Sequence, residues 1–206
     1  MKTDILTALA KRMSRHGFAA RCFDEAAAVV AAFREILDGV ATVGFGGSAT
    51  LRQLGLDRVV ESRDLVFYDH WREGLSPDDV WQSRLAQGRA DLFVTSANAL
   101  TRQGQLVLTD GVGNRLTASV FGPRKALFVV GENKIVDDLT AAFDRIRAIA
   151  APRRAAELNL DVPCVKTGVC AECNSPARVC RSTLILERPS MGLPTAVWLV
   201  RGSWGL

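Results

Sequence analysis

A chain of 206 residues, 48% of them hydrophobic and 23% charged, is long enough to bury a core and too apolar to be a disordered tail. The formal net charge is only +4, and lysines and arginines occur singly or in pairs, which argues against a nucleic-acid-binding surface. The longest apolar run, residues 26–33, is too short to span a membrane, and the start of the chain lacks the apolar core of a signal peptide. We therefore expect a soluble, cytoplasmic protein with a single domain over residues 1–206.

The hydrophobic pattern predicts helices first and strands afterwards. Two amphipathic helices are expected within residues 1–38, because apolar residues recur there at helical spacing. Beyond them, short apolar runs bounded by Gly or Asp predict strands that are buried on both faces. These runs occupy residues 40–43, 64–68, 91–96, 105–109, 125–131, 182–187 and 195–200. We expect the last two to flank or close the structure.

Two further helices are predicted between these strands. Ser76 and Asp79 form a capping pattern at the start of a helix over residues 76–88, and a second helix over residues 136–152 ends at Pro152. Strands that alternate with helices predict an α/β fold, with an open, mostly parallel sheet and helices on both faces. The fold class is therefore α/β, preceded by the N-terminal helices.

A glycine-rich turn links the first predicted strand to a helix within residues 41–55. Glycines allow close approach of a ligand to the backbone, and the helix that follows favours an anion such as phosphate or carboxylate. The turn lacks the lysine of a P-loop and the third glycine of the dinucleotide fingerprint. A tight turn that binds nothing is the alternative. The residues expected to contact the anion are Gly44, Gly46, Gly47, Ser48, Ala49 and Thr50.

Small polar residues are concentrated between residues 95 and 115, where two predicted strands end. Ligands of open α/β sheets bind beyond the carboxyl ends of the strands, so these side chains are expected on the same edge as the glycine turn. The alternative is turn chemistry, in which Asp110 and its neighbours bond to their own backbone in a hairpin loop. The further residues predicted to contact the ligand are Thr95, Asn98, Thr101, Asn114 and Lys134.

No catalytic residue is predicted. His70 follows a strand end and could face the cleft as a general acid or base, but a loop histidine without a function is the simpler reading. Asp69 and Glu132 are conceivable bases that no motif supports.

Four cysteines lie close together within residues 163–181, with the spacing C-x5-C-x2-C-x6-C. Clustered cysteines in a reducing compartment are more often metal ligands or redox thiols than disulfides. Four thiolates suit tetrahedral zinc or an iron–sulfur cluster, and reduced thiols without a metal are the alternative. The fifth cysteine, Cys22, stands alone and is expected to be a small apolar residue. The predicted metal ligands are Cys164, Cys170, Cys173 and Cys180.

Four segments together resemble the LUD domain family, named for lactate utilization proteins, and its branch with a C-terminal four-cysteine segment. They read GFGGSATLRQLG, ADLFVTSANALTRQGQLVLTDGVGNR, FGPRKALFVVGENKIV and PCVKTGVCAECNSPARVC. The resemblance implies a fold related to ribose-5-phosphate isomerase and CoA transferases. It also implies a part in the oxidation of L-lactate to pyruvate, beside partner proteins that carry iron–sulfur clusters.

The resemblance favours an iron–sulfur cluster, such as a 4Fe–4S cluster, at the cysteines and leaves zinc open. Two alternative functions remain. One is an isomerase or CoA transferase with a structural zinc, for which Glu132 is the only candidate carboxylate. The other is a non-catalytic assembly subunit, and assembly into a homo-oligomer also stays open.

Overall fold

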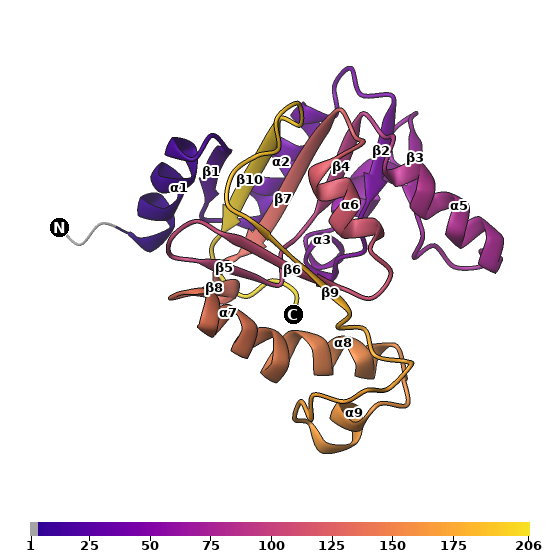
Figure 1. Ribbon diagram of the computed structural model, residues 1–206. Helices are drawn as coiled ribbons and strands as arrows, with labels where there is room; N and C mark the ends of the chain where they lie inside the picture. Colours follow the sequence, from indigo (N-terminus) through magenta and orange to yellow (C-terminus); the bar gives the residue numbers. More distant parts are fainter. Residues whose placement is uncertain (1–3) are drawn as a thin grey trace.

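The computed structural model describes residues 4–206, so the first three residues of the predicted N-terminal helical segment lie outside it. A six-stranded sheet forms the centre of the fold, and all of its neighbouring strands are parallel (Figure 1). Its order is β1 (Ala19–Phe23), β10 (Thr195–Val200), β7 (Lys125–Gly131), β4 (Leu92–Thr95), β2 (Thr42–Phe45) and β3 (Val66–Asp69).

A second, smaller sheet of four strands lies beside the first. Its order is β8 (Ile135–Val136), β5 (Ala99–Thr101), β6 (Leu106–Asp110) and β9 (Ser182–Leu186). The pairs β5–β6 and β6–β9 are antiparallel, and β5–β8 is parallel. A tight turn over residues 101–105 joins β5 to β6.

The helices divide into short segments that follow the strands and a longer C-terminal run. They are α1 (Ile5–Arg15), α2 (Ala26–Ile36), α3 (Ala49–Gln53), α4 (Leu56–Glu61), α5 (Pro77–Gln87), α6 (Asn114–Val120), η1 (Glu132–Lys134), α7 (Leu139–Arg145), η2 (Ile146–Ala150), α8 (Ala151–Glu157) and α9 (Pro163–Thr167). The predicted capping box is present at the start of α5, where Ser76 and Asp79 bond to each other's backbone. None of these helices is long and apolar enough to cross a membrane.

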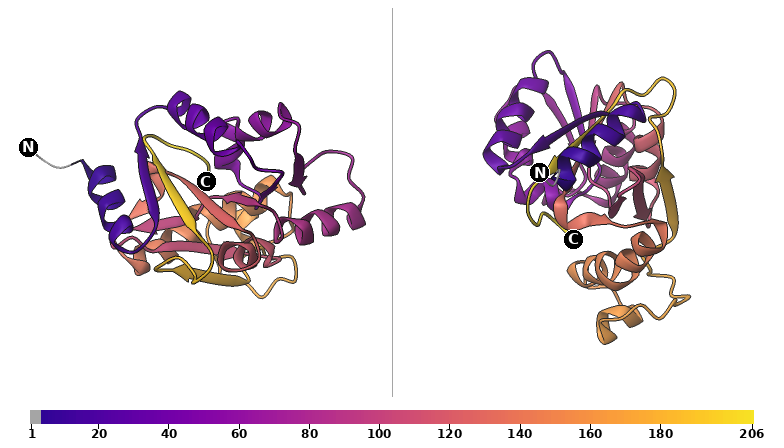
Figure 2. Two further views of the ribbon diagram at one scale, coloured as in Figure 1. Left: turned by 90° about the horizontal axis from the view of Figure 1, so that it is seen from above. Right: turned by 90° about the vertical axis from the view of Figure 1, so that its left-hand side faces the viewer.

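Alternating side chains of the central strands build two cores. On one face of β7, Leu127 and Val129 pack with residues of α2, α3 and α4. On the other face, Phe128 and Val130 pack with α1, α6 and the second sheet. The large sheet is therefore covered on both faces, which is why its strands are almost uniformly apolar. The α/β fold with a mostly parallel sheet is confirmed, and α1 and α5 lie at opposite ends of the molecule (Figure 2).

The structure differs from the expected elements in four places. Strand β1 separates the two N-terminal helices, and β10 lies inside the sheet between β1 and β7 instead of at its margin. The run over residues 105–109 belongs to the second sheet. The helix predicted to end at Pro152 continues to Glu157, because the π-helical segment η2 precedes the proline, so its missing N–H falls in the first turn of α8.

Candidate functional site

A cavity of about 560 Å³ opens at the carboxyl-terminal edge of the large sheet. Its walls come from the segments that follow β2, β3, β4 and β7, together with the end of β6 and the start of α6. Residues of η2 and α8 close it from the other side, below the sheet in Figure 1. This is the edge at which open α/β sheets bind ligands, and the volume lies within the range of about 300–1,000 Å³ typical of small-molecule sites.

The glycine turn after β2 forms one wall of the cavity and requires its glycines. Gly47 has a φ of +66°, and a Cβ there would lie 3.0 Å from the Trp71 ring and 3.1 Å from Cε1 of His70. A Cβ on Gly46 would lie 2.6 Å from Cζ of Phe93. Ser48 occupies the N-cap position of α3 without a side-chain capping bond. The turn therefore brings bare backbone to the cavity surface.

Four basic side chains line the cavity, against two acidic ones. The basic residues are Arg84, Arg115, Lys134 and Arg154, and the acidic residues are Asp110 and Glu157. Both acids are paired, since Asp110 lies 3.5 Å from Nε of Arg115 and Glu157 lies 2.9 Å from Arg154. Nε of Arg84 is buried without a hydrogen-bond partner within residues 4–206. The excess of positive charge suits an anionic ligand.

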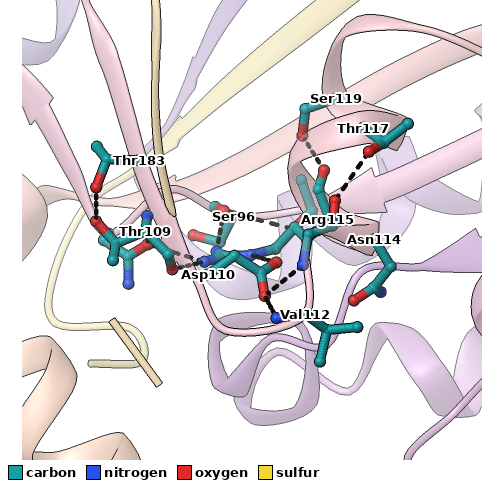
Figure 3. Close-up of polar contacts among 12 residues, drawn as sticks. Ser96, Thr109, Asp110, Val112, Asn114, Arg115, Thr117, Ser119 and Thr183 are labelled. Atoms are coloured by element: carbon teal, nitrogen blue, oxygen red, sulfur yellow. Dashed lines mark hydrogen bonds and ion pairs between the residues drawn. The ribbon is translucent and has the colours of Figure 1, made fainter. Parts of the chain in front are cut away.

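Arg115 holds the loops around the cavity together (Figure 3). Its guanidinium donates to the carbonyl oxygens of Ser96 and Thr109 at 3.1 and 2.6 Å and to Oδ1 of Asn98 at 2.9 Å. Asp110 also accepts from the backbone N–H groups of Val112 and Gly113, so the predicted turn chemistry is present at this residue. The turn leads into α6, however, and not into a hairpin strand. The guanidinium of Arg115 therefore bonds to groups of the protein itself, and it positions the ligand-facing loops.

Lys134 is a buried cation behind the glycine turn. Its Nζ donates to Oγ1 of Thr50 at 2.8 Å, and to Oγ of Ser96 and the carbonyl oxygen of Ala97 at 3.2 Å each. No carboxylate pairs with it in the part of the chain that the structure describes. Burial, reinforced by the positive charges of Arg145 and Arg115, lowers the pKa of Lys134 to about 7. An anion in the cavity would stabilise its charged form.

His70 lines the cavity and lies beside Gly47 of the glycine turn. Its Nδ1 lies 2.7 Å from Nε2 of Gln87, which is fully buried. Burial, followed by the positive charge of Arg84, lowers the pKa of His70 to about 4. The imidazole is therefore uncharged at neutral pH.

The cavity brings together seven of the eleven residues predicted to contact a ligand. These are Gly46, Gly47, Ser48, Ala49, Asn98, Asn114 and Lys134. The other four lie outside its lining. Gly44 packs against the backbone of Gln87, and Thr50 lies behind the turn, where it accepts from Lys134. Thr95 bonds to the carbonyl of Ser96, and Thr101 bonds to Gln105 in the β5–β6 turn.

The cavity residues that sequence reasoning missed include Trp71, Arg84 and Arg154. The guanidinium of Arg154 stacks on the Trp71 ring at 4.1 Å, a contact between α8 and the loop after β3 that no local pattern reveals. The two conceivable bases do not line the cavity. Asp69 pairs with Arg52, and Glu132 accepts from the N–H of Gly202.

The four clustered cysteines surround a second, much smaller cavity of about 20 Å³. All four thiols are free, and burial together with the three neighbouring thiols raises the pKa of Cys164. Arg178 donates to Sγ of Cys180 at 3.3 Å, and the backbone N–H of Glu172 donates to Sγ of Cys170 at 3.5 Å. Within residues 4–206 no three His, Cys, Asp or Glu side chains form a group that could hold a metal ion. The thiols converge without forming a closed ligand set.

The two cavities share a wall made of Ala151, Val179 and Cys180. The cysteine segment is also fixed to the edge of the larger cavity, because the N–H of Arg181 donates to the carbonyl of Asp110 at 3.1 Å. A Cβ on Gly111 would lie 3.1 Å from the carbonyl oxygen of Val179, so the two segments are in close contact. Cys22, expected to be a small apolar residue, lies exposed on β1.

Comparisons with known proteins agree with this architecture. The chain is similar over 96% of its length to 96% of the chain of a DUF162 family protein from Deinococcus radiodurans, with a TM-score of 0.55 and 18% sequence identity. At that identity the likeness concerns the fold alone. A search of curated proteins gave no match. The model of the LUD domain matches residues 6–194. This chain therefore belongs to the LUD domain family.

Proposed function

We propose that this protein is a cytoplasmic component of lactate utilization that takes part in the oxidation of L-lactate to pyruvate. Its large cavity would bind a small anionic or phosphorylated ligand. Its four cysteines would hold a 4Fe–4S cluster that exchanges electrons with an iron–sulfur partner protein. Membership of the LUD domain family supports the general assignment.

The observation that carries the proposal is the wall shared by the two cavities. Cys180 and Val179 line both the cysteine cavity and the anion cavity. A redox centre at the thiols and a ligand in the larger cavity would therefore be neighbours. A zinc clamp whose only task was to hold a loop would not need this arrangement.

The residue types around the cysteine cavity support a cluster of this kind, although in residues 4–206 their side chains are not arranged as a metal site. Four thiolates are the usual ligands of a 4Fe–4S cluster, and the cavity between them is otherwise bounded by Arg178 and by apolar residues such as Ala155 and Val162. The side chain of Arg178 and the backbone N–H of Glu172 donate to two of the sulfurs, and such hydrogen bonds stabilise ligated thiolates. When bound, the cluster would supply one-electron transfer. The chain's own residues would hold it and separate it from solvent.

The cavity residues have a separate task, which is to bind and orient the ligand. The glycine turn offers backbone N–H groups, Arg84 and Lys134 offer positive charge, and Arg115 fixes the loops between them. These contributions do not depend on the metal. Binding of a small anion is therefore expected in the metal-free protein as well.

The metal is tested by analysing protein purified without oxygen, together with its absorption spectrum. Iron and acid-labile sulfide in equal amounts, with a broad visible absorption, are expected. Zinc in place of iron would remove the redox part of the proposal and leave a structural metal site. A protein that holds neither metal after cluster reconstitution would refute the metal site altogether.

The anion site is tested by thermal unfolding in the presence of inorganic phosphate. A ligand that binds only the folded state raises the melting temperature, and above its Kd the stabilisation grows with the logarithm of the ligand concentration. A rise that continues with phosphate concentration in this way and is absent with chloride at equal ionic strength is expected. A response that is the same for both salts would refute a specific anion site.

A further inference from the structure

The hydrogen bonds around His70 fix which of its two ring nitrogens carries the proton. Nε2 of Gln87 lies 3.4 Å from the carbonyl oxygen of Tyr68, and a backbone carbonyl can only accept. The atom facing it must therefore be the amide nitrogen of Gln87 and not its oxygen. The same nitrogen lies 2.7 Å from Nδ1 of His70, so Nδ1 is the acceptor of that bond.

Asn114 strengthens this assignment from the other side. Its Nδ2 donates to Oε1 of Gln87 at 3.1 Å, which places the amide oxygen away from the histidine. Gln87 is fully buried, so water cannot replace these partners and let the amide turn over. A neutral imidazole that accepts at Nδ1 must carry its only proton on Nε2.

The surroundings of His70 favour this uncharged form. The charged side chains that influence it are Arg84 on α5, Arg154 on α8, Asp69 at the end of β3 and Asp110 at the end of β6. Burial and Arg84 have the largest effects and both act against protonation. At neutral pH the imidazole of His70 is therefore uncharged but can still donate a hydrogen bond.

Nε2 is the atom left for a ligand. His70 lines the large cavity, with Cε1 beside Gly47, and within residues 4–206 no group of the protein bonds to Nε2. We infer that His70 is a ligand-binding residue that donates its Nε2–H, as a neutral imidazole, to an oxygen of the anionic ligand. This deepens the proposed function, because it names a group that meets the ligand in the cavity that Lys134 also lines. The acceptor is an unprotonated phosphoryl or carboxylate oxygen.

The tautomer is tested by nitrogen NMR of the metal-free wild-type protein, which has only two histidines. A His16→Gln variant assigns the remaining signals to His70. Nδ1 is expected at the chemical shift of an unprotonated ring nitrogen and Nε2 at that of a protonated one, unchanged from pH 8 to pH 5.5. A proton on Nδ1, or titration near pH 6.5, would overturn the inference.

The ligand contact is tested with inorganic phosphate and with acetate, which distinguish a phosphoryl from a carboxylate ligand. The matched variants are His70→Gln, whose amide can donate from nearly the position of Nε2, and His70→Leu, which cannot donate. Loss of one neutral hydrogen bond weakens binding about tenfold, so the leucine variant should bind about tenfold more weakly and the glutamine variant close to wild type.

Three outcomes separate this inference from the proposed function. Binding by wild type with a shift of the His70 Nε2 signal, lost in His70→Leu, supports both. Binding of equal strength in all three proteins overturns the ligand contact and leaves the anion site intact. Binding of neither anion to wild type refutes the anion site and the contact with it, whatever the tautomer.

Discussion

Replacing the buried Lys134 by methionine should make the protein more stable than wild type at pH 7 and less stable than wild type at pH 9. Methionine matches the length of the side chain but has no charge. Folding lowers the pKa of Lys134 from 10.5 to about 7, which destabilises the native state by about 4 kcal/mol at pH 7. The variant loses three hydrogen bonds of about 1 kcal/mol each. It should therefore be about 1 kcal/mol more stable than wild type at pH 7.

The difference in stability between variant and wild type changes sign at higher pH, because the wild type becomes more stable. Between pH 7 and pH 10.5 the unfolded state binds a proton that the native state has lost, so the stability of the wild type rises with pH. The gain from pH 7 to pH 9 is about 2 kcal/mol for these two pKa values. At pH 9 the methionine variant should then be less stable than wild type by about 1 kcal/mol.

Urea unfolding at both pH values, under reducing conditions, measures these differences. Other groups that titrate in this range cancel when variant and wild type are compared at the same pH. Lys125→Met is the matched control, because Lys125 is exposed at the start of β7, the strand that precedes η1 and Lys134; its effect should not change with pH. A difference between Lys134→Met and wild type that is constant from pH 7 to pH 9 would refute the account of Lys134 as an uncompensated buried charge.

Three further predictions concern other parts of the site. In thermal unfolding, Gly47→Ala should destabilise the protein by about 1 kcal/mol more than Gly55→Ala. Both glycines have φ near +66°, so the backbone strain is the same. A Cβ on Gly47 crowds Trp71 and His70, whereas a Cβ on Gly55 meets nothing within 4 Å. Stability should fall by up to about 3 kcal/mol as the pH drops from 6.5 to 4, because the pKa of His70 is about 4 in the folded state and 6.5 when unfolded, and His70→Leu should flatten that loss. Cys170→Ser should lose the bound metal on elemental analysis, whereas Cys22→Ser, at an exposed position on β1, should retain it.

The order of strands and helices along the chain could largely be predicted because uniform apolar runs with Gly or Asp at their ends are typical of buried parallel strands. Strand β1 was not predicted because its residues, AARCF, are largely exposed and show no alternation of apolar and polar side chains. The second sheet was not predicted for a different reason. The β6 run LVLTD is as apolar as a strand of the large sheet, and only its partners β5 and β9 distinguish it. Pairing partners are a property of the folded chain and are not encoded in a single run.

The site was predictable where one segment builds it. The glycine turn and Lys134 carry a local signature, since their neighbours are strand ends. Arg84 and Arg154 do not, because an arginine that faces a cavity from a helix has the same local sequence as one that faces water. Thr101 was placed at a ligand edge because it follows β4 closely, but it ends the short strand β5 and bonds within its own turn.

The charge of the cavity links Lys134 to ligand binding in a way that can be measured without knowing the ligand. A buried lysine without a carboxylate destabilises the fold, and such a group persists where an anion compensates it during function. An anion beside Lys134 should raise its pKa above 7, so binding near pH 8 should be accompanied by proton uptake. Calorimetry of phosphate binding in buffers of different ionisation enthalpy counts the protons taken up. Uptake in wild type that vanishes in Lys134→Met would show that the lysine responds to the ligand. Binding without proton exchange would mean that Lys134 is only a structural donor to Thr50, Ser96 and Ala97.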